Sequence, residues 1–417
     1  MIVLEIMNKS VNLSRIHPIY TAFALALGSA ISLGLARFSY ALFLPIMRED
    51  LNWTYLVAGT MNTANAAGYF FGAISCPWLF RKLLPSTIFI CAAFLTSLLI
   101  GLSGSITGTL ELHILRIFAG VFSAFVFVSG GILSAQLGNV NHSKSGLILG
   151  IYYGGTGLGI ILSTLIIPSA NHWALIQKWQ HPWQLGWLML ALVGFLFSIA
   201  LIKPSTSIHP TEIIRNTSQS TKISSYRKMV ISYCCFGMGY IGYMTFVIAL
   251  LGQIGMSSNL IYLFYALLGA SVMVASRIWA KMLDRYKGGS SLGILNCMLG
   301  FACILPAMVA INLDQNESLG IVGISIIYLS GIIFGGCFLS AVASTTAFVK
   351  HNLPQQQWVS GITIFTITFA LGQVIGPALT GWIADSFHSL ALGFLLSGCV
   401  LLIGALTAFS QKSLSNQ

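Results

Sequence analysis

The chain has 417 residues, of which 56% are hydrophobic and only 7% charged, and its mean hydropathy is +0.86. Soluble domains carry about 25% charged residues, so this composition excludes a soluble protein and indicates an integral membrane protein. The net charge of +11 does not indicate a nucleic-acid-binding protein, because the basic residues are spread through short loops between apolar runs.

Apolar runs of about 20 residues or more recur along the whole chain. Such a run crosses the hydrocarbon layer as a helix, whereas a β-barrel would show short segments of alternating hydropathy. The sequence therefore predicts an all-α membrane protein. We predict twelve transmembrane helices over residues 19–46, 54–80, 86–106, 109–138, 146–170, 183–203, 228–252, 258–281, 290–311, 319–349, 358–384 and 389–410.

The first predicted helix contains Arg37 close to its middle. A charge at this depth costs about 2.5 to 3.5 kcal/mol, so Arg37 is expected to face protein or a water-filled cavity. Two interpretations remain open, a substrate contact in a cavity or a buried ion pair with an acid such as Glu111. Other polar side chains within apolar runs also need partners. The candidate substrate-binding residues are Arg37, Tyr40, Asn65, Tyr240, Tyr243 and Gln373.

Charged residues near the ends of predicted helices are candidates for proton coupling or gating. Glu111 and His113 lie within two turns of Arg116, and a carboxylate or an imidazole there can carry a proton. An ion pair at the outer end of the helix explains the same residues equally well. Arg277 lies one turn before Lys281 and is interpreted as part of an inner gate. The full set of coupling or gating candidates is Glu111, His113, Arg116, Arg277, Asp284 and Arg285.

The glycine-rich segment Gly155-Thr156-Gly157-Leu158-Gly159 lies inside an apolar run and not in a strand-to-helix turn. We therefore interpret it as close helix packing and not as a nucleotide site. The eight cysteines all lie in apolar runs without metal-ligand spacing, so neither disulfides nor a metal site is predicted. No phosphate-binding loop followed by Lys and Ser or Thr appears, so neither ATP nor any other cofactor is predicted.

The longest polar segment separates six predicted helices from six. It predicts an N-terminal six-helix bundle over residues 1–203, a cytoplasmic linker over 204–227 and a C-terminal six-helix bundle over 228–417. Two pseudo-symmetric halves place a substrate site at their interface near the middle of the membrane. The halves match at a constant spacing of 203 residues (237 minus 34), which pairs Gly34, Arg37, Tyr40 and Phe43 with Gly237, Tyr240, Tyr243 and Phe246.

The distribution of Lys and Arg predicts the orientation. Of the 20 basic residues, fifteen lie on one side of the predicted helices, only Arg48 and Lys178 lie on the other, and three lie within helices. Cytoplasmic loops carry the excess of positive charge. We therefore predict a multi-pass membrane protein with both termini in the cytoplasm.

Three segments carry a family resemblance: Gly34-Leu-Ala-Arg37-Phe38 followed by Leu44-Pro45, Gly239-Tyr240, and Gly372-Gln373 continuing to Asp385. In them the chain resembles the major facilitator superfamily, and within it the bacterial YbfB/YjiJ-type group. The resemblance implies the major-facilitator fold and secondary transport, in a bacterial inner (plasma) membrane. Arg116-Ile-Phe-Ala-Gly120 is similar to the fourth-helix motif of that superfamily, whereas Cys76 stands where its pattern expects an aspartate.

These features together predict a secondary active transporter of alternating-access type, and not an enzyme. The buried positive charge favours a small organic anion, which arginine can hold with two parallel hydrogen bonds, with coupling to protons. The alternative is a proton-linked efflux pump for apolar or aromatic compounds, with Arg37 paired to an acid. A membrane-embedded enzyme or sensor would need a catalytic cluster or a soluble domain. The expected partners are a small solute and the lipid bilayer, with no nucleic acid, and the chain is expected to act as a monomer.

Overall fold

The computed structural model describes residues 18–140, 145–208, 223–313, 319–354 and 357–414. The regular secondary structure within these ranges is helical, as the apolar runs predict. The elements are α2 (Pro18–Ser29), η2 (Ala30–Phe38), α3 (Tyr40–Asp50), α4 (Tyr55–Leu79), α5 (Pro85–Ser103), α6 (Thr109–Val140), α7 (Ser145–Ile176), α8 (Trp183–Ala200), α9 (Ile202–Thr206), η4 (Ile223–Tyr226), α10 (Arg227–Gln253), α11 (Ser258–Arg285), α12 (Ser290–Asn312), α13 (Ile321–Asn352), α14 (Trp358–Ser386) and α15 (Leu390–Phe409).

In the described part of the chain, eleven helices are long and apolar enough to cross a membrane, with Pro18–Asp50 counted as one. The helix of the predicted twelve that does not meet this criterion is α4. Its 25 residues are enough to span the hydrocarbon layer, but its sequence includes Asn62, Asn65 and several small or hydroxyl residues. Because both asparagines are buried, these polar groups face protein. The predicted all-α membrane fold is confirmed.

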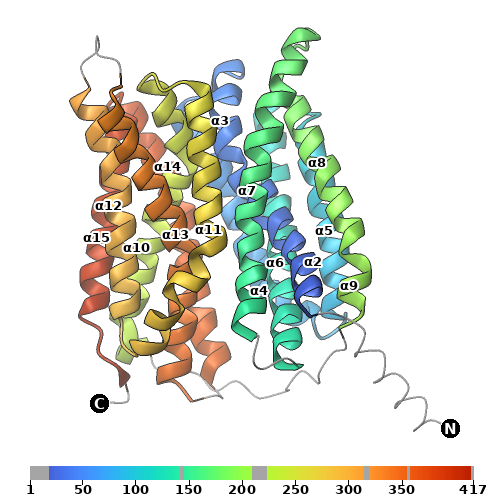
Figure 1. Ribbon diagram of the computed structural model, residues 1–417, viewed down its shortest axis with the longest axis vertical. Helices are drawn as coiled ribbons and strands as arrows, with labels where there is room; N and C mark the ends of the chain where they lie inside the picture. Colours follow the sequence, from blue (N-terminus) through green and yellow to red (C-terminus); the bar gives the residue numbers. More distant parts are fainter. Residues whose placement is uncertain (1–17, 141–144, 209–222, 314–318, 355–356, 415–417) are drawn as a thin grey trace, which may run out of the picture.

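The helices form two groups that stand side by side (Figure 1). Helices α2 to α9, in blue to green, form the N-terminal group, and α10 to α15, in yellow-green to red, form the C-terminal group. Extensive contacts between α4 and α14 and between α7 and α11 join the groups. The division at residues 203 and 228 stays a prediction; α9 continues past the first boundary, and residues 209–222 of the predicted linker lie outside the described ranges.

The first transmembrane helix is not a continuous α-helix, although the apolar run predicts one. Residues Ala30–Phe38 form a fully buried π-helical segment, in which the amide of Ser39 donates to the carbonyl oxygen of Gly34 at 3.0 Å. A β-carbon at Gly34 would lie 2.6 Å from the α-carbon of Gly159 on α7, so the segment passes α7 more closely than any other residue would permit. Single turns of π-helix occur frequently at functional sites.

The glycines of α7 pack against helices of both groups. A β-carbon at Gly155 would lie 2.0 Å from the carbonyl oxygen of Ala26 on α2. A β-carbon at Gly157 would lie 2.2 Å from the carbonyl oxygen of Gly269 on α11. The interpretation of this glycine run as close helix packing is therefore confirmed.

Candidate functional site

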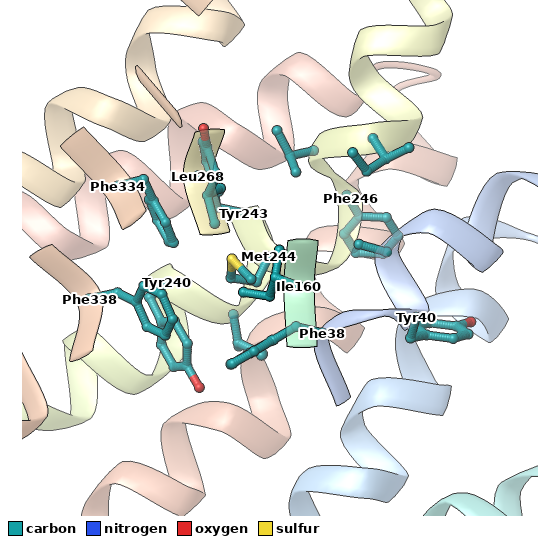
Figure 2. Close-up of a cluster of buried hydrophobic side chains, with 14 of the residues drawn as sticks. Phe38, Tyr40, Ile160, Tyr240, Tyr243, Met244, Phe246, Leu268, Phe334 and Phe338 are labelled. Atoms are coloured by element: carbon teal, nitrogen blue, oxygen red, sulfur yellow. The ribbon is translucent and has the colours of Figure 1, made fainter. Parts of the chain in front are cut away.

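Apolar side chains from both groups fill the interface near the middle of the helices (Figure 2). Phe38 of the π-helical segment points toward Phe338 of α13, and their ring centroids are 5.5 Å apart at an angle of 87°. Ile160 of α7, Met244 of α10 and Leu268 of α11 belong to the same buried cluster. Close packing of these side chains holds the two groups together at this level.

Arg37 lies beside this cluster and is only 2% exposed. Its guanidinium carbon is 5.6 Å from the ring centroid of Tyr69 on α4 and 5.9 Å from that of Phe38. Its Nε and Nη2 atoms are buried and have no hydrogen-bond partner among the described residues. Within the same residues the one ion pair joins His181 and Asp50, so Arg37 is a buried cation without a counter-ion.

The C-terminal group places an unsatisfied acceptor at the same interface. Gln373 of α14 is fully buried, and its Nε2 atom donates to the hydroxyl of Tyr240 on α10. Its Oε1 atom has no partner within the described ranges. The ring of Tyr240 stacks on that of Phe338 with the centroids 6.0 Å apart, and Phe338 packs against Phe38, the ring beside Arg37. Three of the predicted substrate-binding residues, Arg37, Tyr240 and Gln373, therefore lie around the same group of aromatic rings.

Arg116 of α6 is the second buried guanidinium, and the protein backbone provides part of its hydrogen bonding. Its Nη1 atom donates to the carbonyl oxygen of Ala36 at 2.7 Å, and its Nη2 atom donates to Asn62 Oδ1 at 3.1 Å. Asn62 Nδ2 in turn donates to Thr245 Oγ1 of α10 at 2.7 Å. This chain of hydrogen bonds connects the π-helical segment, α6 and α4 with the C-terminal group, which gives Arg116 a positioning role.

The remaining substrate-binding candidates differ in their surroundings. Tyr40 donates its hydroxyl hydrogen to the carbonyl oxygen of Ala58 at 2.8 Å, and its ring lies 4.9 Å from the Arg116 guanidinium carbon. Asn65 Nδ2 donates to the carbonyl oxygen of Arg116 at 3.2 Å. Tyr243 is placed elsewhere, because its hydroxyl bonds to Ser330 at 2.7 Å inside the C-terminal group. Tyr243 therefore does not belong to the arrangement around Arg37.

Tyr69 was not among the predicted site residues, although its ring faces Arg37. The sequence contained a signal that could have identified it. Asn62, Asn65 and Tyr69 are spaced three and four residues apart, and this spacing places them on one face of α4. Both asparagines contact Arg116, so the same face was a reasonable place to look for the neighbours of Arg37.

The two outer-end candidates lie at the start of α6. Glu111 is in the first turn and exposed, and the described residues offer it no ion pair. His113 is half-buried, with Nε2 3.0 Å from Thr60 Oγ1 and Nδ1 2.7 Å from the carbonyl oxygen of Thr109. The predicted ion pairs of Glu111 with Arg116 or Arg37 are therefore not present in the structure. His113 is the better placed of the two, because it is bonded to α4.

The three inner-gate candidates, Arg277, Asp284 and Arg285, are exposed on the last turns of α11. No ion pair involving them occurs in the described part of the chain. The guanidinium carbon of Arg285 lies 5.9 Å from the ring centroid of the adjacent Tyr286. These residues are therefore not assembled into a gate in this conformation, and their gating role stays a prediction.

A carboxylate joins the groups at the membrane face where α4 begins and α14 ends. Asp385 accepts hydrogen bonds from the backbone amides of Tyr55 and Leu56, at 2.9 and 2.7 Å. Gln253 Nε2 donates to the Tyr55 hydroxyl at 2.6 Å, and the Arg48 guanidinium carbon lies 3.9 Å from the Tyr55 ring centroid. A carboxylate at a helix N-terminus is stabilising. We call this arrangement the Asp385 contact; it closes the interface at this face.

Comparison with known proteins agrees with this architecture. Residues 29–409 match the family model described as "Uncharacterised MFS-type transporter YbfB". The crystal structure of the nucleoside transporter NupG is similar, with a TM-score of 0.68 and 12% sequence identity, over 95% of this chain and 100% of that chain. A bacterial homolog of the human lysosomal transporter Spinster, in an inward-facing and occupied conformation, is similar with a TM-score of 0.67, 12% identity and coverage of 94% and 96%. No curated protein matches the sequence. The predicted major-facilitator fold is confirmed.

Proposed function

We propose, from the premise that the chain belongs to the family of YbfB-type major facilitator transporters, that it moves a small organic anion across the membrane. Membership makes the protein a multi-pass membrane transporter and not an enzyme. At 12% identity the solved transporters support the fold alone, so the nucleoside specificity of NupG is not carried over. The nature of the solute has to be argued from the residues at the interface.

The observation that carries the proposal is the buried guanidinium of Arg37. Two of its nitrogen atoms lack hydrogen-bond acceptors among the described residues, and no carboxylate there pairs with it. Burial of an unpaired charge is unfavourable, and an anion that enters between the two groups would relieve this cost. A carboxylate suits the position because its two oxygens can accept parallel hydrogen bonds from guanidinium.

The alternative, an efflux pump for apolar or aromatic compounds, required Arg37 to be neutralised by an acid of the protein. In the described ranges the acids are Glu49, Asp50, Glu111, Asp284 and Asp385, and none of them pairs with an arginine. The premise of that alternative is therefore unsupported. The anion proposal explains the same arginine without a further partner.

Transport would follow alternating access, with the Asp385 contact closing one face of the interface. The excess of Lys and Arg supports a cytoplasmic location for the other face, where α2 begins and α15 ends, in a bacterial inner membrane. A reporter fused at Gln177 should then lie outside the cytoplasm, and a cytoplasmic signal would contradict this orientation.

We further propose that transport is coupled to protons through His113 or Glu111, and that the protein acts as a monomer.

Substitution of Arg37 tests the proposal. Purified protein in vesicles is assayed with a panel of labelled carboxylic acids, with and without a pH gradient. Arg37→Lys should raise the apparent dissociation constant about ten-fold, because ammonium cannot reproduce the planar fork of guanidinium. Arg37→Ala should abolish uptake without unfolding the protein, since no buried carboxylate of the described chain would be left unpaired. Arg227→Ala, at an exposed arginine to which no transport role is assigned, serves as the matched control. Unchanged uptake by Arg37→Ala would refute the proposal.

A further inference from the structure

Four aromatic rings of the C-terminal group form what we call the aromatic strip: Tyr233, Phe236 and Tyr240 on α10, and Phe369 on α14. The three residues of α10 are spaced three and four apart, so one face of the helix carries all of them. The centroid of Phe369 lies 5.0 Å from that of Tyr233, 5.4 Å from that of Phe236 and 5.6 Å from that of Tyr240. The rings therefore form one continuous surface.

The rings of the aromatic strip share nearly one orientation. Phe369 is inclined by 19° to Tyr233, by 13° to Phe236 and by 12° to Tyr240. Aromatic pairs in proteins adopt either offset parallel or edge-to-face arrangements. Edge-to-face pairs also occur in this protein, for example Phe38 with Phe338 and Tyr233 with Phe365. A surface of parallel rings can accept another flat ring in the same orientation, whereas a puckered ring makes poorer contact with it.

The two ends of the aromatic strip have different chemistry. Toward the face where α10 begins, Tyr233 lines a cavity of about 110 Å³ together with Phe365 and the threonines at 345, 346 and 366. An engineered apolar cavity of about 150 Å³ binds benzene, so this cavity has the scale of a single aromatic ring. At the other end, Tyr240 is bonded to Gln373 and stacks on Phe338, which packs against Phe38, the ring beside Arg37. The aromatic strip therefore connects a ring-sized cavity to a buried cation.

We propose that the transported anion is a flat aromatic carboxylate with a single ring. Its carboxylate pairs with the free Nε and Nη2 of Arg37, and its ring lies parallel to the rings of Tyr240 and Phe369. The Oε1 atom of Gln373, which lacks a donor in the described chain, accepts from a hydrogen-bond donor on the ring where one is present. This inference rests on the proposed anion transport and specifies the chemical class of the anion.

Three matched probes separate the roles of ring and charge. Benzoate has both, cyclohexanecarboxylate keeps the charge on a puckered ring, and benzamide keeps the flat ring without the charge. Binding of each is measured by calorimetry on the detergent-purified full-length protein. Benzoate should bind about 2- to 12-fold more tightly than cyclohexanecarboxylate, the range given by stacking. Benzamide should bind more weakly than either acid and should be insensitive to Arg37→Lys.

Two variants assign the preference to the aromatic strip. Phe369→Leu keeps an apolar side chain but removes one of the two stacking rings, so the preference for benzoate over cyclohexanecarboxylate should fall. Phe301→Leu makes the same change on α12, where the ring is 55% exposed, and should leave the preference intact.

The possible outcomes are distinguishable. Equal affinity of the wild-type protein for both acids, with Arg37→Lys weakening both, would overturn the aromatic assignment and leave the anion site in place. A benzoate preference that is undiminished in Phe369→Leu would also overturn it. Absence of binding by either acid would overturn this inference, while the panel of carboxylic acids continues to test the anion site. Acid binding that is unaffected by Arg37→Ala would overturn this inference together with the proposed function.

Discussion

Replacing Asp385 by asparagine should weaken the closure of the interface at one membrane face. The carboxylate accepts two backbone hydrogen bonds, from Tyr55 and Leu56, across the boundary between the groups. Asparagine keeps one oxygen acceptor but loses the second oxygen and the negative charge at the N-terminus of α4. Loss of such a cap and of its charge at a helix terminus costs about 1 to 2 kcal/mol. The ratio of open to closed interface should therefore rise about 5- to 30-fold.

Hydrogen exchange of the amides at the start of α4 measures this change directly. The amides of Tyr55 and Leu56 are protected by Asp385 only while the interface is closed, so their exchange should accelerate by the same factor in Asp385→Asn. Glu49→Gln is the matched control, since Glu49 is an exposed acid at the end of α3, close to the same helix start. Unchanged exchange in Asp385→Asn, or equal acceleration in Glu49→Gln, would show that the carboxylate does not hold the groups together.

Two further predictions concern packing and coupling. Gly68→Ala should lower the melting temperature strongly, because a β-carbon there would lie 1.9 Å from the carbonyl oxygen of Ile117. At Gly336 a β-carbon would have no atom within 4 Å, so Gly336→Ala should be neutral or should stabilise the protein by up to about 1 kcal/mol. Equal melting temperatures for the two variants would contradict the packing described for α4. His113→Gln should abolish accumulation of a labelled acid against its gradient while exchange of the acid survives, and Glu111→Gln should not. Accumulation retained in both variants would remove this pair from the mechanism.

The helices could be predicted from the sequence because each one needs an apolar run long enough to cross the hydrocarbon layer of the bilayer. The predicted range 290–311, for example, differs from α12 by one residue. The break in the first helix could not be predicted in the same way. It coincides with the close approach of Gly34 to Gly159, which are far apart in the sequence and meet only after folding. The amino-acid composition of a single apolar run does not reveal a contact with a residue on another helix.

The sequence predicted that charged side chains are buried, but it did not predict which groups bind them. Arg37 was identified because a charge in an apolar run needs a reason, and this argument requires only the sequence. Its pairing with Glu111 was an open interpretation that the structure does not support. An ion pair of Glu111 with Arg116 was also expected, yet residues five apart in an α-helix point about 140° away from each other. Arg116 donates to the carbonyl oxygen of Ala36 and to Asn62 Oδ1 instead, and a backbone acceptor carries no signal in the sequence.

The π-helical segment also fixes the angular phase between the two ends of the first helix. Residues before Ala30 lie against α7, whereas residues after Phe38 face α10 and the C-terminal group. The hydrogen bonds of a π-helix span five residues and not four, so each residue of the segment turns the chain by less than the roughly 100° of an α-helix. A regular α-helix over the same residues would therefore leave the arginine and the face that follows it at a different angle, without any change in composition. The π-helical geometry of this segment, and not only its residue types, is therefore a condition for a working interface.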